Sequence, residues 1–258
     1  MNRSTLKMLK NLAIIALLFL IAALIIWTVQ QKKQKKAQEM RINIEQLASG
    51  HNLISEVDVK ETLMKSFAVS LVGLPLGAIN MERVEEVLEA DPFVLDAEVY
   101  IDAQQVIFIN VRQREPILRV IDDNGLNYYL DKEGNKMPLS KHFTANVLVA
   151  NGNIPPHVTN FLTKRKHALR DLFELTNRIL NDKFLRAMIE QIYVNDKGEY
   201  ILTPILGNQK ILLGPYENIE NKFFRLKTFY KEAIPYAGWK RYKTINLKFK
   251  NQVVCKKR

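Results

Sequence analysis

Few residues of this sequence have the types and the spacing that chemistry would need. The single cysteine, Cys255, lies three residues before the C-terminus, and the four histidines are scattered without metal-ligand spacing. Because a lone cysteine forms no internal disulfide, the fold must be held by packing alone. Acidic residues gather around Gly125 and Gly134, where they could be catalytic or bind calcium. No EF-hand spacing is present, so the glycines favour turns.

Motifs of known catalytic machinery are also absent. The sequence has no Walker loop, no G-x-S-x-G elbow, no H-E-x-x-H and no dinucleotide fingerprint. Paired carboxylates are not excluded by sequence alone. We nevertheless expect a protein that binds other proteins and is not an enzyme, with no metal, no cofactor and no small-molecule substrate.

The net charge of +11 could indicate a nucleic-acid partner, but its distribution favours a membrane. Most of the excess flanks one apolar segment, where basic side chains suit anionic lipid head groups. We therefore expect a lipid bilayer and no nucleic acid as partner. Residues 1–38 contain no acidic side chain, and their basic residues are Arg3, Lys7, Lys10, Lys32, Lys33, Lys35 and Lys36.

The apolar segment, residues 12–29, has no charged side chain and predicts a transmembrane helix. At about 1.5 Å per residue it spans about 27 Å, close to the thickness of the hydrocarbon core. The run is longer than the apolar part of a cleaved signal peptide, and no A-x-A-like site follows it, so a retained anchor is favoured. The basic residues on its two sides nearly balance and do not decide its orientation. We expect the membrane anchor to include Leu12, Leu17, Phe19, Leu24, Trp27 and Val29.

Residues 39–116 predict a compact unit with the order strand, helix, helix, strand, strand. Ser55 and Asn80 begin the two helices as N-terminal caps. Alternating apolar residues predict one strand near 41–45 and a strand pair at 97–101 and 107–111. A short basic linker, residues 30–38, would join this unit to the anchor.

Residues 117–258 predict a β domain with packed helices. Apolar residues at helical spacing predict helices near 169–179 and 219–230. Near the end, 244–250 alternates cleanly, which predicts a strand with Ile245, Leu247 and Phe249 on one side. A turn at 251–252 and a last strand from 253 would follow. The fold class is therefore α+β, with a mixed or antiparallel sheet.

Three features of the chain, taken together, resemble the bacterial cell-division family FtsQ, called DivIB in some bacteria. The first is the layout of a short tail (1–11), an anchor and a β-α-α-β-β unit like a POTRA domain. The second is the run from Leu88 to Pro116, with Asp-Pro-Phe-Val, Ala-Glu-Val and Gln-Arg-Glu-Pro. The third is the sequence YKTINLKFKNQVV, which is similar to the family's closing hairpin. Gln113 and Lys248 replace the family's commoner Glu and Arg.

The resemblance implies a place and a set of partners. It implies a single-pass protein of the bacterial inner (cytoplasmic) membrane, with the tail in the cytoplasm and the main domain in the periplasm, at the division septum. It also implies a scaffold without catalysis. The implied partners are divisome membrane proteins, notably the single-pass coiled-coil proteins of the FtsB and FtsL type.

The binding mechanism that we expect is β-strand addition at the C-terminal edge of the sheet. A last strand near Val253 would leave main-chain groups unpaired, and an extended partner segment could pair with them. Two other functions stay open, a POTRA-bearing export or assembly factor and a membrane-anchored cell-wall enzyme. The expected partner-binding residues are Tyr242, Phe249, Asn251, Gln252, Val253 and Val254.

Overall fold

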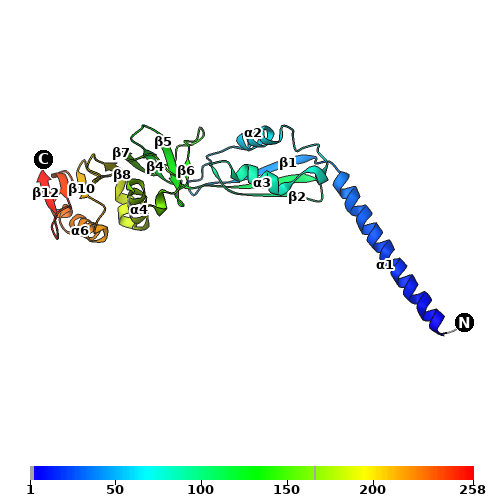
Figure 1. Ribbon diagram of the computed structural model, residues 1–258. Helices are drawn as coiled ribbons and strands as arrows, with labels where there is room; N and C mark the ends of the chain where they lie inside the picture. Colours follow the sequence, from blue (N-terminus) through cyan, green and yellow to red (C-terminus); the bar gives the residue numbers. More distant parts are fainter. Residues whose placement is uncertain (1–2, 166) are drawn as a thin grey trace. The chain divides into compact units, whose positions relative to one another are not determined.

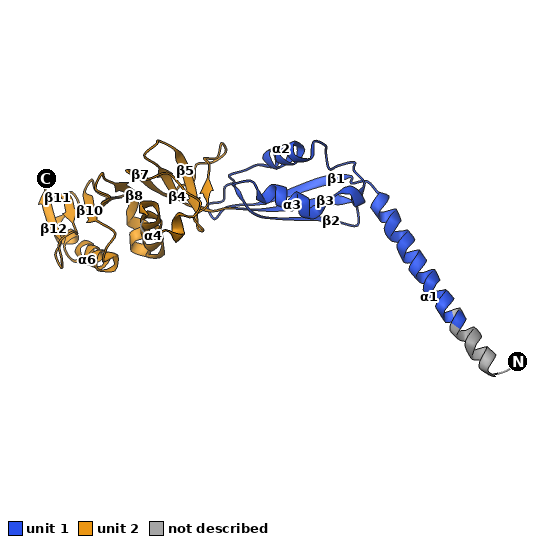
Figure 2. Cartoon of the chain, viewed as in Figure 1, with its two compact units in different colours: residues 1–113 blue, residues 114–258 orange. Residues whose placement is uncertain are grey.

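The computed structural model describes residues 3–165 and 167–258, apart from the side chains of 3–11 and 13. Of the expected cytoplasmic tail, Met1 and Asn2 lie outside the described residues. The chain divides into two units, residues 1–113 and 114–258 (Figure 2). Each unit is built around its own hydrophobic core.

The N-terminal helix α1 (Arg3–Gln34) contains the predicted membrane anchor. Its segment Ile14–Gln34 is long and apolar enough to cross a membrane. The segment predicted as a linker, 30–38, is helical in its first part, because the helix continues through Gln34. Gln and Lys are good helix formers and simply extend a helix that is already nucleated.

The first unit contains a three-stranded sheet covered by two helices (Figure 1). The strand order is β1-β3-β2, with β1 parallel and β2 antiparallel to the central strand. The order along the chain is the predicted one, strand, helix, helix, strand, strand. The elements are β1 (Glu39–Glu45), α2 (Glu56–Phe67), the 3₁₀ turn η1 (Leu76–Ala78), α3 (Met81–Glu89), β2 (Val94–Ile101) and β3 (Val106–Gln113).

Both helices that cover this sheet begin at the predicted caps. Ser55 and Asp58 form a reciprocal capping box at the start of α2, and the Asn80 side chain accepts a hydrogen bond from the Arg83 amide, 3.1 Å away. The apolar stripes of α2 and α3 then pack on the sheet, where Ile107 and Ile109 are fully buried. Local capping and one-sided burial therefore explain this unit.

The second unit begins at Arg114, slightly earlier than the predicted boundary after residue 116. The Arg114 guanidinium pairs with the buried Asp131 carboxylate, with 3.0 Å between nitrogen and oxygen, and β4 already starts at Pro116. A buried carboxylate needs such a partner, and it fixes Arg114 to this unit.

The second unit contains one nine-stranded mixed sheet, ordered β12-β11-β10-β9-β8-β7-β4-β5-β6. Its pairs β4/β7, β7/β8 and β10/β11 are parallel and the others antiparallel. The predicted α+β class with a mixed sheet is confirmed. The strands are β4 (Pro116–Ile121), β5 (Asn127–Asp131), β6 (Lys136–Met137), β7 (Leu148–Gly152), β8 (Ile189–Val194), β9 (Tyr200–Pro204), β10 (Lys210–Gly214), β11 (Tyr242–Asn246) and β12 (Val254–Lys257).

A single row of side chains crosses most of this sheet on its buried face. Each member is the register partner of the next, and all belong to or pack against one core. Helices α4 and α6 bury their apolar stripes in the same core, so they join distant strands into one body. The row is Val120, Ala150, Ile192, Leu202, Ile211, Ile245 and Cys255. The helices are η2 (Phe161–Thr163), α4 (Ala168–Asn181), α5 (Lys183–Met188), α6 (Ile219–Glu232) and α7 (Ile234–Ala237).

The strand predicted over 244–250 ends early. β11 stops at Asn246, whose side chain accepts a hydrogen bond from the Lys248 amide, 3.0 Å away. Ile245 and Leu247 are fully buried as predicted, but Phe249 is 51% exposed. An Asn side chain that bonds to the backbone two residues later favours a turn, and this turn breaks the alternation.

Candidate partner-binding edge

Strand β12 ends the nine-stranded sheet. It pairs antiparallel with β11, and no strand lies on its other side among the described residues. Its outer border therefore presents main-chain N–H and C=O groups that no ladder satisfies. The opposite end of the sheet is β6, which has only two residues and offers much less.

The turn that leads into β12 is held by Arg225 of α6. Its guanidinium donates hydrogen bonds to the carbonyl oxygens of Leu247 (3.0 Å), Phe249 (2.8 Å) and Gln252. The Asn221 side chain accepts a further bond from the same group, at 2.8 Å. One planar cation thus binds three carbonyl oxygens of the turn and stabilises the start of β12.

A second tie holds the same turn to the neighbouring hairpin. The Lys248 ammonium lies 2.9 Å from the Glu199 carboxylate. This hydrogen bond, with one from Asn195, holds the pKa of Glu199 below its usual range. The Lys248 stem passes over Gly214, which has a φ of +78° and where a Cβ would come within 2.9 Å of it. Glycine is therefore needed there for both conformation and space.

The residues predicted for partner binding occupy three different environments. Phe249 is exposed in the turn, and Val254, the first residue of β12, is 43% exposed. Val253 is half-buried and packs against the core. The structure therefore brings Phe249 and Val254 to the surface close together in the chain and assigns Val253 partly to packing.

The remaining predicted residues lie just inside the edge. Tyr242 is on β11, and its ring packs on Phe229 with centroids 5.7 Å apart. Asn251 has a φ of +56° and makes the turn possible. Gln252 contributes its carbonyl to the Arg225 contact. These three residues support the structure of the edge.

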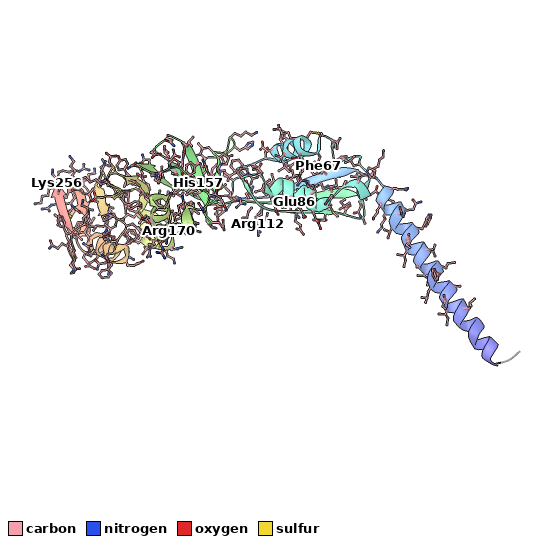
Figure 3. All side chains as sticks on the ribbon, in the orientation of Figure 1. Phe67, Glu86, Arg112, His157, Arg170 and Lys256 are labelled. Carbon is pink, nitrogen blue, oxygen red and sulfur yellow. The ribbon has the colours of Figure 1, made fainter. Side chains whose placement is uncertain are left out.

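The surroundings of β12 are strongly basic. Residues 239–258 contain no acidic side chain, and Figure 3 marks Lys256 on β12 itself. These cations are all exposed, so they create a positive potential around the free border, although Lys248 also pairs with Glu199. The basic residues are Lys240, Arg241, Lys243, Lys248, Lys250, Lys256, Lys257 and Arg258.

The lone cysteine lies in β12 and faces inward. Cys255 is the register partner of Ile245 and packs against the core. Burial raises the pKa of its thiol, which keeps it protonated and poorly nucleophilic at neutral pH. Its role here is packing.

The predicted membrane-anchor residues form no part of either core. All six are exposed along α1, as a helix surrounded by lipid requires. Trp27 lies near the C-terminal end of the apolar run, where an indole suits the membrane interface. They are Leu12, Leu17, Phe19, Leu24, Trp27 and Val29.

Sequence reasoning did not find Arg225. It lies within α6 between the stripe residues Phe223 and Leu226 and looks like an ordinary charged residue. Its partners come more than twenty residues later in the chain. Sequence reasoning also missed the exposed aromatic rings of Tyr236 and Trp239, which lie between α6 and β11. The interleaving of aromatic and basic residues at 236–243 was the available signal.

The fold agrees with comparisons to known proteins. Residues 115–256 match the family described as FtsQ/DivIB, C-terminal related, which covers more than half of the chain. The chain belongs to the FtsQ/DivIB family. The predicted resemblance is thereby confirmed. Residues 35–112 separately match a POTRA-like domain, in agreement with the three-stranded sheet and two helices of the first unit.

A curated relative in the FtsQ/DivIB family supports the same assignment. The chain is 28% identical over 195 residues to the cell division protein FtsQ of Rhodothermus marinus, which covers 71% of this chain and 68% of that protein. Membership of the FtsQ/DivIB family supports a role in cell division. One helix of the described residues is long and apolar enough to span a membrane, which together with this relative fits a single-pass membrane protein.

Proposed function

We propose that this chain is a non-catalytic scaffold of bacterial cell division that recruits and holds other divisome membrane proteins. Membership of the FtsQ/DivIB family supports the division role. The partners that we propose are single-pass coiled-coil proteins of the FtsB and FtsL type. The N-terminus would lie in the cytoplasm and both folded units outside the inner membrane, at the division septum.

The free border of β12 is the observation that carries this proposal. An extended partner segment would pair with β12 and become the tenth strand of the sheet, taking its affinity from main-chain hydrogen bonds. Residues that alternate along β12 face opposite sides of the sheet. Val254 and Lys256 therefore flank the incoming strand on one face, and Cys255 and Lys257 on the other.

The side chains around the border indicate what kind of segment would bind. Val254 offers an apolar contact, and Phe249, exposed in the preceding turn, offers an aromatic anchor. The exposed cations on and around β12 favour a segment that carries acidic residues. Apolar contact and opposite charge would set the register of the added strand.

Proline substitution on β12 tests this proposal. Successive residues of an antiparallel strand direct their N–H groups to opposite sides. Of Lys256→Pro and Lys257→Pro, one therefore removes an N–H from the free border and the other removes a bond to β11. We expect one variant to keep its melting temperature and lose capture of the FtsB/FtsL-type partner from co-expressing cells.

Alanine at the same two positions provides the matched control. Lys256→Ala and Lys257→Ala remove the charge and keep the main-chain N–H, so each should retain most of the partner capture. Deletion of residues 253–258 should give a folded, membrane-bound chain that captures no partner. If both proline variants capture the partner as well as the wild type, strand addition at β12 is wrong.

A further inference from the structure

An exposed apolar loop lies between α2 and α3 of the first unit. Residues 66–81 contain no charged side chain. We name residues 68–79 the juxtamembrane loop. Its Leu71 and Ile79 are buried in the core of the first unit, whereas Val69 and Val72 point outward and are 49% and 37% exposed. The loop is thus fixed from inside while part of its apolar surface remains uncovered.

Main-chain hydrogen bonds attach this loop to the segment that follows the membrane helix. The Leu76 amide donates to the Lys35 carbonyl (2.8 Å) and the Gly73 amide to the Ala37 carbonyl (2.8 Å). In the reverse direction, the Ala37 amide donates to the Leu74 carbonyl (2.9 Å). These three bonds make the loop and the exit of α1 one structure.

Direct contact with α1 completes this attachment. A Cβ placed on Gly77 would lie 2.9 Å from the Cβ of Lys33, so loop and helix touch at a point where a larger residue would not fit. Figure 3 marks Phe67, the last residue of α2, just before the loop begins. The contact identifies the height at which the loop sits along α1.

That height corresponds to the lipid head groups. Lys33 follows the last residue of the apolar run, Val29, by about 6 Å along the helix axis. The head-group layer is about 5–8 Å thick on each side of the hydrocarbon core. A loop that touches Lys33 therefore lies at head-group depth when α1 spans the bilayer.

We propose that the juxtamembrane loop is a second membrane contact, which rests on the same bilayer that α1 crosses. Val69 and Val72 would insert into the head-group layer, and the lysines of the segment attached to the loop, Lys32, Lys33, Lys35 and Lys36, would bind anionic lipids. At this depth the exposed apolar side chains would contact lipid and not water. This accounts for their lack of protein contacts. Its consequence is that the first unit is mounted on the membrane surface and does not swing on a flexible tether.

We propose lipid as the binding partner of the juxtamembrane loop because the loop is continuous with the anchor helix. A juxtamembrane segment of a partner protein could also cover an apolar loop, and the test separates the two by omitting every other protein. The inference rests on α1 spanning the bilayer and does not depend on the free border of β12.

Depth-dependent quenching in nanodiscs tests the inference. The full-length chain has one cysteine, so a Cys255→Ser background accepts a single fluorescent label at Val69→Cys or Val72→Cys. The nanodiscs contain phosphatidylethanolamine, phosphatidylglycerol and a lipid with a nitroxide on its head group. We expect strong quenching of both loop labels, with phosphatidylglycerol increasing it.

Two further positions serve as controls. Leu95 is 38% exposed, almost the same as Val72, but it lies on β2 at the end of the sheet away from the start of β1. A label at Leu95→Cys should be quenched several-fold less than one in the loop. A label at Val29→Cys should be quenched by a lipid carrying its nitroxide in the acyl chain. Equal quenching at 69, 72 and 95 would overturn the loop contact, and no quenching at 29 would overturn the anchor beneath it.

Discussion

A single buried amide, that of Gln113, connects the last strand of the first unit to the residues just before α2. Its Oε1 accepts hydrogen bonds from the Leu53 and Ile54 amides, at 2.6 and 3.3 Å. Its Nε2 donates to the Glu45 carbonyl (2.8 Å) and to the Asn52 side chain (3.0 Å). A carboxylate could accept the first two bonds but could not donate the others. Gln113 therefore has a structural role that a glutamate at this position could not fill.

Replacing this residue should weaken the first unit. Gln113→Ala removes both the acceptor and the donor from a buried site, so we expect the free energy of unfolding to fall by about 1–3 kcal/mol. Urea denaturation followed by circular dichroism measures the change. Gln38→Ala, at an exposed glutamine of the same unit, should change little. An equal effect of the two substitutions would contradict the role given to the Gln113 amide.

Arg225 has the corresponding role in the second unit. Arg225→Ala removes three carbonyl contacts from the turn before β12, and amide exchange at 247–252 should accelerate about tenfold for each 1.4 kcal/mol of stabilisation lost. Arg225→Lys should not restore slow exchange, because one ammonium cannot reach three carbonyls as a planar guanidinium does. Lys231→Ala, at an exposed position of the same helix, is the control. Unchanged exchange in Arg225→Ala would show that the turn holds without it.

At the scale of elements, features that depend on neighbouring residues, such as helix starts, were predicted correctly. The capping residues Ser55 and Asn80 begin their helices as expected, because a cap and its amide partner are only three residues apart. The predicted end of this strand was wrong. The alternation of apolar residues at 244–250 continues past the turn that the Asn246 side chain forms, where β11 stops.

Contacts between residues that are distant in the chain could not be predicted from the sequence. β10 and β11 pair in parallel with helix α6 between them, and no local pattern says which strands become neighbours. The contact of Arg225 with the turn before β12 has the same origin. A sequence shows that Val253 and Val254 can form a strand, but only the order of the sheet shows that β12 ends it.

Asp182 links three helices and should make stability depend on pH. Its side chain caps α5 by accepting bonds from the Phe184 (3.0 Å) and Leu185 (3.1 Å) amides, and it pairs with Lys227 of α6. The Lys227 hydrogen bond, aided by the two amides, lowers the pKa of Asp182 below its usual 3.8. A depressed pKa contributes stability above the unfolded-state pKa, and this contribution disappears as pH falls through the folded-state value.

The substitution Asp182→Ala should therefore cost about 1 kcal/mol of unfolding free energy at neutral pH. The cost should shrink in acid, at a pH below the lowered pKa, because the wild-type carboxyl is then protonated too. Guanidinium denaturation of both proteins at neutral and acid pH measures it. Lys227→Met should reproduce only the ion-pair part. A cost that stays constant across this range would contradict the assignment of Asp182 as a charged cap.

At the scale of the whole molecule, each part of the chain offers a surface. α1 presents an uncovered run of apolar side chains, the juxtamembrane loop adds the exposed Val69 and Val72, and β12 presents unpaired main-chain groups beside a basic surface. The sequence predicted the anchor, the order of the two units and the family, because composition and motif order carry them. The loop's contact with α1 escaped prediction because it depends on hydrogen bonds between 35–37 and 73–76.

Hydrogen exchange of the full-length chain, with and without its FtsB/FtsL-type partner, tests the central claim most directly. Strand addition predicts that partner binding slows exchange of the outward amides of residues 254–257, while β6 at the other end of the sheet stays unchanged. The same slowing should be absent in the proline variant that leaves the melting temperature intact. Tight partner binding that protects another surface, and leaves 254–257 exchanging at the rate of the free protein, would contradict the claim.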